Sequence, residues 1–168
     1  VFPRLLEQRG RDAPIRIWVP GCSTGEEVYS LAMSLMGFLA GANVEVPITI
    51  FGTDVSLAVL EKARAARYPE SIERDVSPGR LQQFFTRTMG GYQISRAVRD
   101  ACVFARHDIT RDPPFSRIDL ISCRNVLIYL TTPLQRRIFP TFHYALNQPG
   151  YLVLGRAAAA FSSVESLV

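Results

Sequence analysis

Five short apolar runs that lack strict alternation constrain this chain more than any other feature. Alternating apolar and polar residues are typical of strands with one solvated face, whereas continuous apolar runs indicate strands buried on both faces. Segments with helical periodicity separate these runs, and this order predicts an α/β fold, a mainly parallel sheet with helices on both faces. The expected strands are Ile15–Val19, Val46–Phe51, Ala101–Ala105, Ile118–Ser122 and Tyr151–Leu154.

The segments between the strands predict three main helices, Glu26–Leu39, Leu57–Arg67 and Pro133–Leu146. The last follows "TTP", in which a capping threonine precedes a proline at the first helical position. Residues 68–100 interrupt the strand–helix rhythm with a short helix around Leu81–Phe85 and a Gly90-Gly91 pair typical of a hairpin turn. We interpret this segment as a small antiparallel insertion on one domain that spans residues 1–168, since 168 residues suit a single core.

Composition excludes several classes of protein. The net charge is +4, but the arginines are scattered among acidic residues and no basic run exceeds Arg136-Arg137, so we expect no nucleic-acid partner. No apolar run approaches the roughly 20 residues of a membrane span. The three cysteines show no metal-ligand spacing, so we expect no metal site and free thiols in a reducing, cytoplasmic setting.

The first strand leads into the turn Gly21–Gly25, which two acids, Glu26 and Glu27, follow directly in "WVPGCSTGEEVYSLAM". Ligands bind beyond the carboxyl ends of parallel strands, and glycines allow a close backbone approach. Two acids would repel a pyrophosphate and would suit a ligand that carries an ammonium group. The alternative is that the acids only stabilise the helix dipole, which is the preferred interpretation for Glu26.

Polar residues also close the other strands. Asp54 is placed to accept hydrogen bonds from ribose hydroxyls, or else to cap the helix that starts near Ser56. Asp108 is placed to accept from an adenine amino group, with Ile109 against the ring. A ribose, an adenine and an amino group, without pyrophosphate, together indicate S-adenosylmethionine.

The chain resembles the CheR-type protein-glutamate methyltransferases of bacterial chemotaxis over about residues 14–155. The resemblance lies in the order of "STGEE", "GTD" and "CRNVLIY", and in "LNQPGYLVLG". It implies a Rossmann-like class I S-adenosylmethionine-dependent methyltransferase fold. The implied cofactor residues are Gly21, Ser23, Glu27 for the ammonium group, Asp54 for the ribose, Leu60, Asp108 and Ile109 for the adenine, and Cys123, Arg124 and Asn125 at the methionine end.

The resemblance places Tyr129 near the transferred methyl group and implies methylation of glutamate side chains of chemoreceptor-like proteins, with S-adenosylhomocysteine as product. It also suggests fused methylesterase or sensor domains and a hairpin that docks a receptor tail; the alternative is an edge that only covers the core. An ionised carboxylate needs no general base, so neither His107 nor His143 needs a catalytic role. The second hypothesis for the function is a non-catalytic regulatory module that binds S-adenosylmethionine or its product.

Three departures from the family pattern accompany the resemblance. The chain begins at "VFPRLLEQRG", after the helical region that the relatives carry, Ala157–Ala160 replace a "G-x-S-E" type motif, and the chain stops at "SSVESLV". We therefore expect a sheet without its final antiparallel pair. A nucleic-acid methyltransferase is disfavoured because "DPPF" at 112–115 precedes the fourth strand and so indicates a rigid loop.

Overall fold

A computed structural model describes residues 1–8, 13–124 and 126–155 of the chain. Its core is a five-stranded sheet in the order β6-β2-β1-β7-β8, and every pair of neighbouring strands is parallel. The strands are β1 (Ile15–Pro20), β2 (Ile48–Asp54), β6 (Cys102–Arg106), β7 (Ile118–Cys123) and β8 (Leu146–Leu154). The predicted mainly parallel α/β fold is confirmed.

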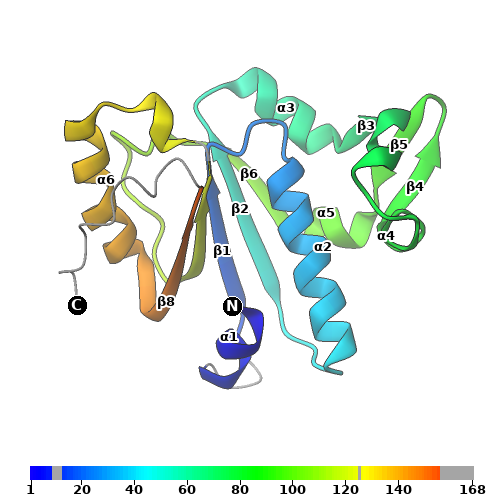
Figure 1. Ribbon diagram of the computed structural model, residues 1–168, viewed down its shortest axis with the longest axis horizontal. Helices are drawn as coiled ribbons and strands as arrows, with labels where there is room; N and C mark the ends of the chain where they lie inside the picture. Colours follow the sequence, from blue (N-terminus) through cyan, green and yellow to red (C-terminus); the bar gives the residue numbers. More distant parts are fainter. Residues whose placement is uncertain (9–12, 125, 156–168) are drawn as a thin grey trace.

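Two apolar clusters show that helices cover both faces of this sheet. On β1, Ile17 and Val19 pack with α2 (Glu26–Gly41) and α3 (Leu57–Ala65), whereas Trp18 packs with α6 (Thr132–Ala145) on the opposite face. Figure 1 shows α2 and α6 on either side of the central strands. The alternation of β1 side chains between two cores explains why its sequence is apolar at every position except Arg16.

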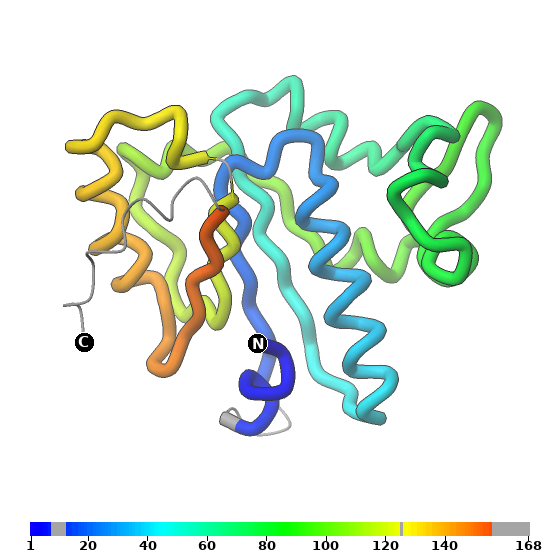
Figure 2. Tube along the Cα trace, viewed as in Figure 1, coloured from blue at the N-terminus to red at the C-terminus, as the bar shows by residue number. Residues whose placement is uncertain are grey.

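The expected insertion is a separate three-stranded antiparallel sheet, with the strand order β3-β5-β4. The predicted hairpin turn between β4 and β5 is formed by Met89 and Gly90, and Gly91 is the first residue of β5. In Figure 2 this segment, drawn in green, lies at one edge of the molecule, away from α6 and β8. Its elements are β3 (Arg67–Pro69), the 3-10 helix η1 (Glu70–Arg74), α4 (Pro78–Phe84), β4 (Phe85–Thr88), β5 (Gly91–Ile94) and α5 (Arg96–Asp100).

Some boundaries differ from the sequence-based prediction. The helix expected over Leu57–Arg67 ends at Ala65, because Ala66 takes a left-handed conformation and Arg67 starts β3. Strand β8 begins at Leu146 rather than Tyr151, and its pairing with β7 shifts register around "NQPG". The N-cap of α6 is Thr131 and not the expected Thr132, so Pro133 is the second residue of the helix, and the Thr131 side chain makes no capping hydrogen bond. The short helix α1 (Phe2–Gln8) was not predicted.

Candidate functional site

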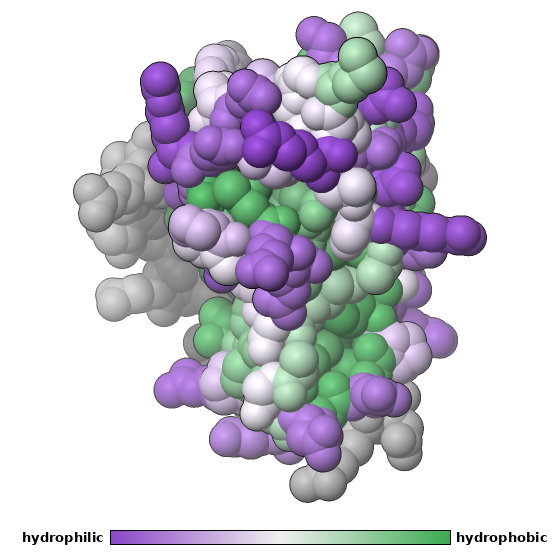
Figure 3. All heavy atoms as spheres, turned by 90° about the vertical axis from the view of Figure 1, so that its right-hand side faces the viewer, coloured by the Kyte–Doolittle hydropathy of each residue, from purple (hydrophilic) through white to green (hydrophobic). Residues whose placement is uncertain are grey.

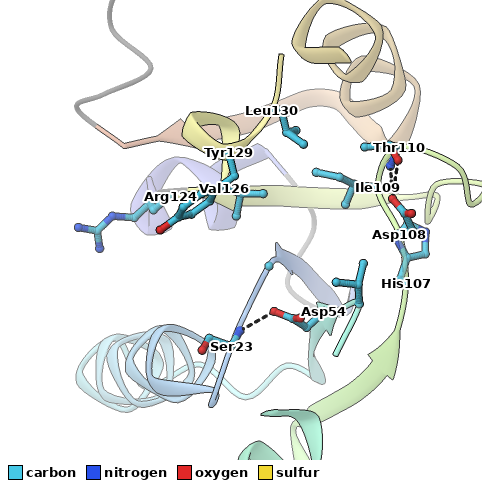
Figure 4. A pocket seen from close by; sticks show the side chains of 12 residues that line it. Ser23, Asp54, His107, Asp108, Ile109, Thr110, Arg124, Val126, Tyr129 and Leu130 are labelled. Carbon is cyan, nitrogen blue, oxygen red and sulfur yellow. Dashed lines mark hydrogen bonds between the residues drawn. The ribbon is translucent and has the colours of Figure 1, made fainter. Parts of the chain in front are cut away.

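The main candidate site is a cavity of about 450 Å³ at the carboxyl ends of the sheet strands. It lies where the strand order reverses, between β1 with its neighbours β2 and β6 on one side and β7 on the other, which is the usual ligand position in open α/β sheets. Figure 4 shows side chains that line it. They are Ser23, Asp54, Val55, His107, Asp108, Ile109, Thr110, Arg124, Val126, Tyr129 and Leu130, together with Gly21.

The turn after β1 is shaped by backbone conformations that glycine favours. Gly21 has φ of +64°, and a Cβ at this position would lie 2.3 Å from Cγ2 of Val126, so any side chain would collide with the opposite wall. The N–H of Cys22 donates to the carbonyl of Thr53 (2.9 Å), which ties the turn to β2. The turn therefore presents its backbone to the cavity in a fixed position.

Asp54 closes β2 and holds both neighbouring loops. Its Oδ2 accepts the N–H of Ser23 (3.0 Å), and its Oδ1 accepts the N–H of Ser56 (2.9 Å). The second contact is the helix-capping interaction that the sequence left open as an alternative. Since each carboxylate oxygen has two lone pairs, the side chain still has acceptor capacity toward the cavity that it lines.

Asp108 lies across the cavity from Ser23 (Figure 4). Its Oδ1 accepts the hydroxyl (2.6 Å) and the N–H (2.9 Å) of Thr110. These hydrogen bonds are the main reason why the pKa of Asp108 is lowered, with a smaller contribution from the Arg111 guanidinium. Asp108 is therefore a hydrogen-bond acceptor at neutral pH, and Ile109 lines the cavity next to it.

Glu27 faces a second cavity of about 500 Å³, which Arg124 shares with the first. Its carboxylate accepts a hydrogen bond from the hydroxyl of Ser122, a buried residue of β7. The neighbouring Glu26 is instead occupied by the hydroxyl of Thr24 at 2.6 Å. Glu26 also borders this cavity, so the two acids differ in their hydrogen-bond partners and not in the cavity that they line.

Four of the expected cofactor residues do not line the first cavity or lie outside the described chain, and Glu27 is one of them because it lines only the second cavity. Leu60 is fully buried in the core, and Cys123 packs in the α6 cluster, where burial raises the pKa of its thiol to about 12. Neither side chain lines either cavity. Asn125 lies outside the described residues.

Tyr129 belongs to the 3-10 helix η2 (Leu127–Tyr129), and 83% of its surface is exposed at the cavity. Sequence reasoning did not assign Val55, Thr110, Val126 or Leu130, which also line it. Their positions directly after strands or beside predicted residues are the only signal that could have found them.

His107 also lines the cavity, although no role was expected for it. It is buried, its Nε2 lies 2.9 Å from the carbonyl of Pro113, and its ring contacts Trp18 edge-on. These contacts make it part of the cavity wall.

Across residues 1–8, 13–124 and 126–155, no group of three or more His, Cys, Asp or Glu side chains is arranged to hold a metal ion. Within the same part of the chain, no helix combines the length and the apolar character that crossing a membrane requires.

Comparison with known proteins gives consistent results. The CheR methyltransferase SAM-binding domain family matches residues 1–167. An uncharacterized 104.1 kDa protein of Rhodobacter capsulatus is 40% identical over 159 residues, which are 95% of this chain and 17% of that protein. Chemotaxis protein methyltransferase 1 of Pseudomonas aeruginosa is 33% identical over 95% of this chain and 60% of its own length. The chain thus spans less than two thirds of these relatives.

A solved structure shows the same fold. The glycopeptide N-methyltransferase MtfA complexed with S-adenosylmethionine gives a TM-score of 0.51 at 14% identity, over 91% of this chain and 51% of that one. The match to residues 1–167 decides the family. The chain belongs to the CheR methyltransferase family, as a SAM-binding domain.

Proposed function

We propose that this domain binds S-adenosylmethionine and, within its whole protein, transfers the methyl group to glutamate side chains of methyl-accepting chemotaxis receptors. The observation that carries the proposal is the cavity beyond β1, β2, β6 and β7, which brings Asp54, Asp108 and Tyr129 together. The name of the P. aeruginosa relative supports the activity. The long R. capsulatus relative supports a multidomain setting, with methylesterase or sensor domains as candidates.

The residues present fit this cofactor. Asp54 has acceptor capacity for ribose hydroxyls, and Asp108 is an ionised acceptor for an adenine amino group, with Ile109 as an apolar neighbour. Glu27 supplies a carboxylate for an ammonium group in the adjoining cavity, and Arg124 borders both cavities. Gly21 lets the backbone of the turn lie against Val126, where any side chain would collide.

Methyl transfer to a glutamate side chain requires few catalytic groups from the protein. The bound cofactor supplies a methyl group on a positively charged sulfur. A glutamate acceptor has an ordinary pKa of about 4.3 and is already ionised at neutral pH, so no residue needs to remove a proton. The residues of this domain then contribute binding, orientation and exclusion of water, and correct positioning alone can supply roughly 7–11 kcal/mol of a barrier.

The test has two stages. Calorimetric titration of the full-length protein with S-adenosylmethionine should show binding, and methyl-labelled cofactor should then transfer label to receptor cytoplasmic fragments in a form that base releases, as expected for an ester. Absence of cofactor binding would contradict the proposal at its first step. Binding without transfer to receptors would instead support the non-catalytic regulatory module.

A further inference from the structure

The segment that carries Tyr129 is held in place by a buried side chain from a different element. The turn η2 has two backbone hydrogen bonds between residues three apart. The N–H of Tyr129 donates to the carbonyl of Val126, and the N–H of Leu130 donates to the carbonyl of Leu127 (both 3.1 Å). Because the Tyr129 ring is largely exposed, packing does not fix it. The position of Tyr129 therefore depends on what holds the backbone of η2.

Gln135, in the first turns of α6, makes contacts on both sides of Tyr129. Its side-chain nitrogen donates to the carbonyl of Leu127 (2.7 Å) and to the carbonyl of Leu130 (3.0 Å). The two carbonyls fix the orientation of the amide, since an oxygen in that position would face two other oxygens. The N–H of Gln135 also donates to the carbonyl of Thr131 (3.0 Å), which holds the residue at the start of the helix.

The chemistry of Gln135 is unusual for its surroundings. Only 8% of its surface is exposed, and its Oε1 is buried without a hydrogen-bond partner among the described residues. A buried polar atom without a partner is unfavourable, and an apolar residue of similar size at this position would avoid that cost. The contacts that an apolar residue could not make are the two hydrogen bonds to η2.

We propose that Gln135 is a positioning residue, which fixes Tyr129 at the cavity by clamping the backbone on both sides of it. This inference rests on the proposed function, in which Tyr129 lies near the transferred methyl group. A polar side chain is required because both anchoring points are carbonyl oxygens, and an amide nitrogen supplies two donors from one atom.

The experiment compares Gln135→Met with Gln82→Met in the full-length protein. Methionine has a similar length and no donor, and Gln82 is exposed on α4. We expect Gln135→Met to lower kcat about tenfold or more while KM for S-adenosylmethionine changes little, because small misplacements at a reacting centre cost up to about 100-fold. Hydrogen exchange of the peptide around residues 126–131 should accelerate, and Gln82→Met should change neither quantity.

A double variant separates positioning from a general loss of stability. In a Tyr129→Phe background, Gln135→Met should lower kcat by much less than it does alone, because the group being positioned has been removed. Additive effects, or unchanged exchange of residues 126–131, would overturn the proposal. If the wild-type protein neither binds nor uses the cofactor, the proposed function fails, whereas hydrogen exchange still decides whether Gln135 clamps η2.

A second variant covers the case in which Gln135→Met does not fold. Gln135→Glu preserves the shape, and its protonated form can still donate one hydrogen bond. As the pH rises and this carboxyl loses its proton, a negative charge faces two carbonyl oxygens. The activity of Gln135→Glu relative to wild type should therefore fall with rising pH, and a constant ratio would contradict the clamp.

Discussion

The Asp54 carboxylate lines the cavity and also accepts hydrogen bonds from the backbone of two neighbouring loops. It accepts one N–H from the turn after β1 and one from the start of α3, so it joins the two loops that form one side of the site. A substitution at Asp54 therefore acts on both the geometry of the turn and any ligand that the carboxylate contacts.

We expect Asp54→Ala to weaken the binding of S-adenosylmethionine more than any other single substitution in the cavity. Hydrogen bonds to charged groups contribute about 1.5–3 kcal/mol each, and the variant also removes the two that hold the loops. Calorimetry should show the loss of affinity, and denaturant unfolding a lower stability. Asp75→Ala, at an exposed position after η1, serves as the control. Unchanged affinity in Asp54→Ala would contradict the ribose assignment.

Glu26 and Glu27 should respond differently to loss of charge. Both acids line the second cavity, but Glu27 is half-buried with its orientation set by Ser122, whereas Glu26 is exposed and accepts from Thr24. We expect Glu27→Gln to lower cofactor affinity clearly and Glu26→Gln to change it little, as measured by the same titration. Glu26→Gln is the matched control. A larger loss of affinity in Glu26→Gln than in Glu27→Gln would show that the ammonium contact belongs to Glu26.

Individual site residues were predictable where they follow a strand, and not where they depend on register. Asp54, Asp108 and Arg124 close apolar runs, so their place at one edge of a parallel sheet follows from the pattern. The hydrogen bond between Ser122 and Glu27 joins residues 95 positions apart and depends on how α2 packs over β7. Gln135 was not predicted as a positioning residue. Helical periodicity indicates which face of α6 it lies on, but not which backbone carbonyls of η2 its side chain contacts.

At the scale of elements, the insertion is attached to the turn between β1 and α2. The hydroxyl of Tyr68, in β3, donates to the carbonyl of Thr24 (3.1 Å), and its ring contacts Tyr29. Strand β5 in turn lies against β3 so closely that a Cβ at Gly91 would be 2.1 Å from the carbonyl oxygen of Tyr68. The small sheet therefore requires glycine at this position.

We expect Gly91→Ala to destabilise the protein by about 1–3 kcal/mol, the usual cost of forcing atoms into a packed site. The matched control is Gly79→Ala on α4, where a Cβ has no neighbour within 4 Å. That substitution should be neutral or stabilising by about 0.5–1 kcal/mol, because alanine favours the helix. Urea unfolding measures both, and equal stabilities of the two variants would show that β5 can move away from β3.

The helices, strands and turns that the sequence predicted are those defined by residues close together in the chain. The hairpin was predicted because a Gly-Gly pair defines its own turn, and α2 because its apolar stripe is long. The helix α1 was missed because it has only seven residues, and its packing of Phe2 on Phe38 is a tertiary contact. The early start of β8 was missed because proline and glycine suggest a break, whereas the structure accommodates them in a register shift.

At the scale of the whole molecule, the two sheets present separate surfaces. The cavity lies at the carboxyl ends of the large sheet, and none of the described residues of β4 or β5 lines it. Among the described residues β4 pairs only with β5, so its other edge has no strand partner there, and its residues 86–88 have exposed side chains. Figure 3 shows this side of the molecule, where hydrophilic side chains surround apolar patches. An open edge is suited to the addition of a strand from a partner.

We expect this edge to bind an acidic tail of the receptor substrate, with Arg87 as the contact that selects negative charge. Deletion of residues 87–92 with a short Gly-Ser bridge should abolish binding of the tail. This deletion retains Ile94 and Ser95 at the base of the hairpin, where their N–H groups donate to the carbonyls of Ala66 and Phe84, respectively. Arg87→Glu should weaken tail binding, while cofactor affinity stays at the wild-type value in this variant because the cavity is elsewhere.

The measurement is calorimetric titration of the full-length protein with a peptide of the receptor tail and, separately, with S-adenosylmethionine. Arg136→Glu, an exposed charge reversal on α6, is the matched control and should leave tail binding intact. Arg87 also lies 3.5 Å from Glu70 and against Tyr92, so its reversal removes local contacts as well, but exposed ion pairs contribute only about 0–1 kcal/mol. If both hairpin variants bind the tail as wild type does, β4 only covers the core, and the partner must recognise another surface.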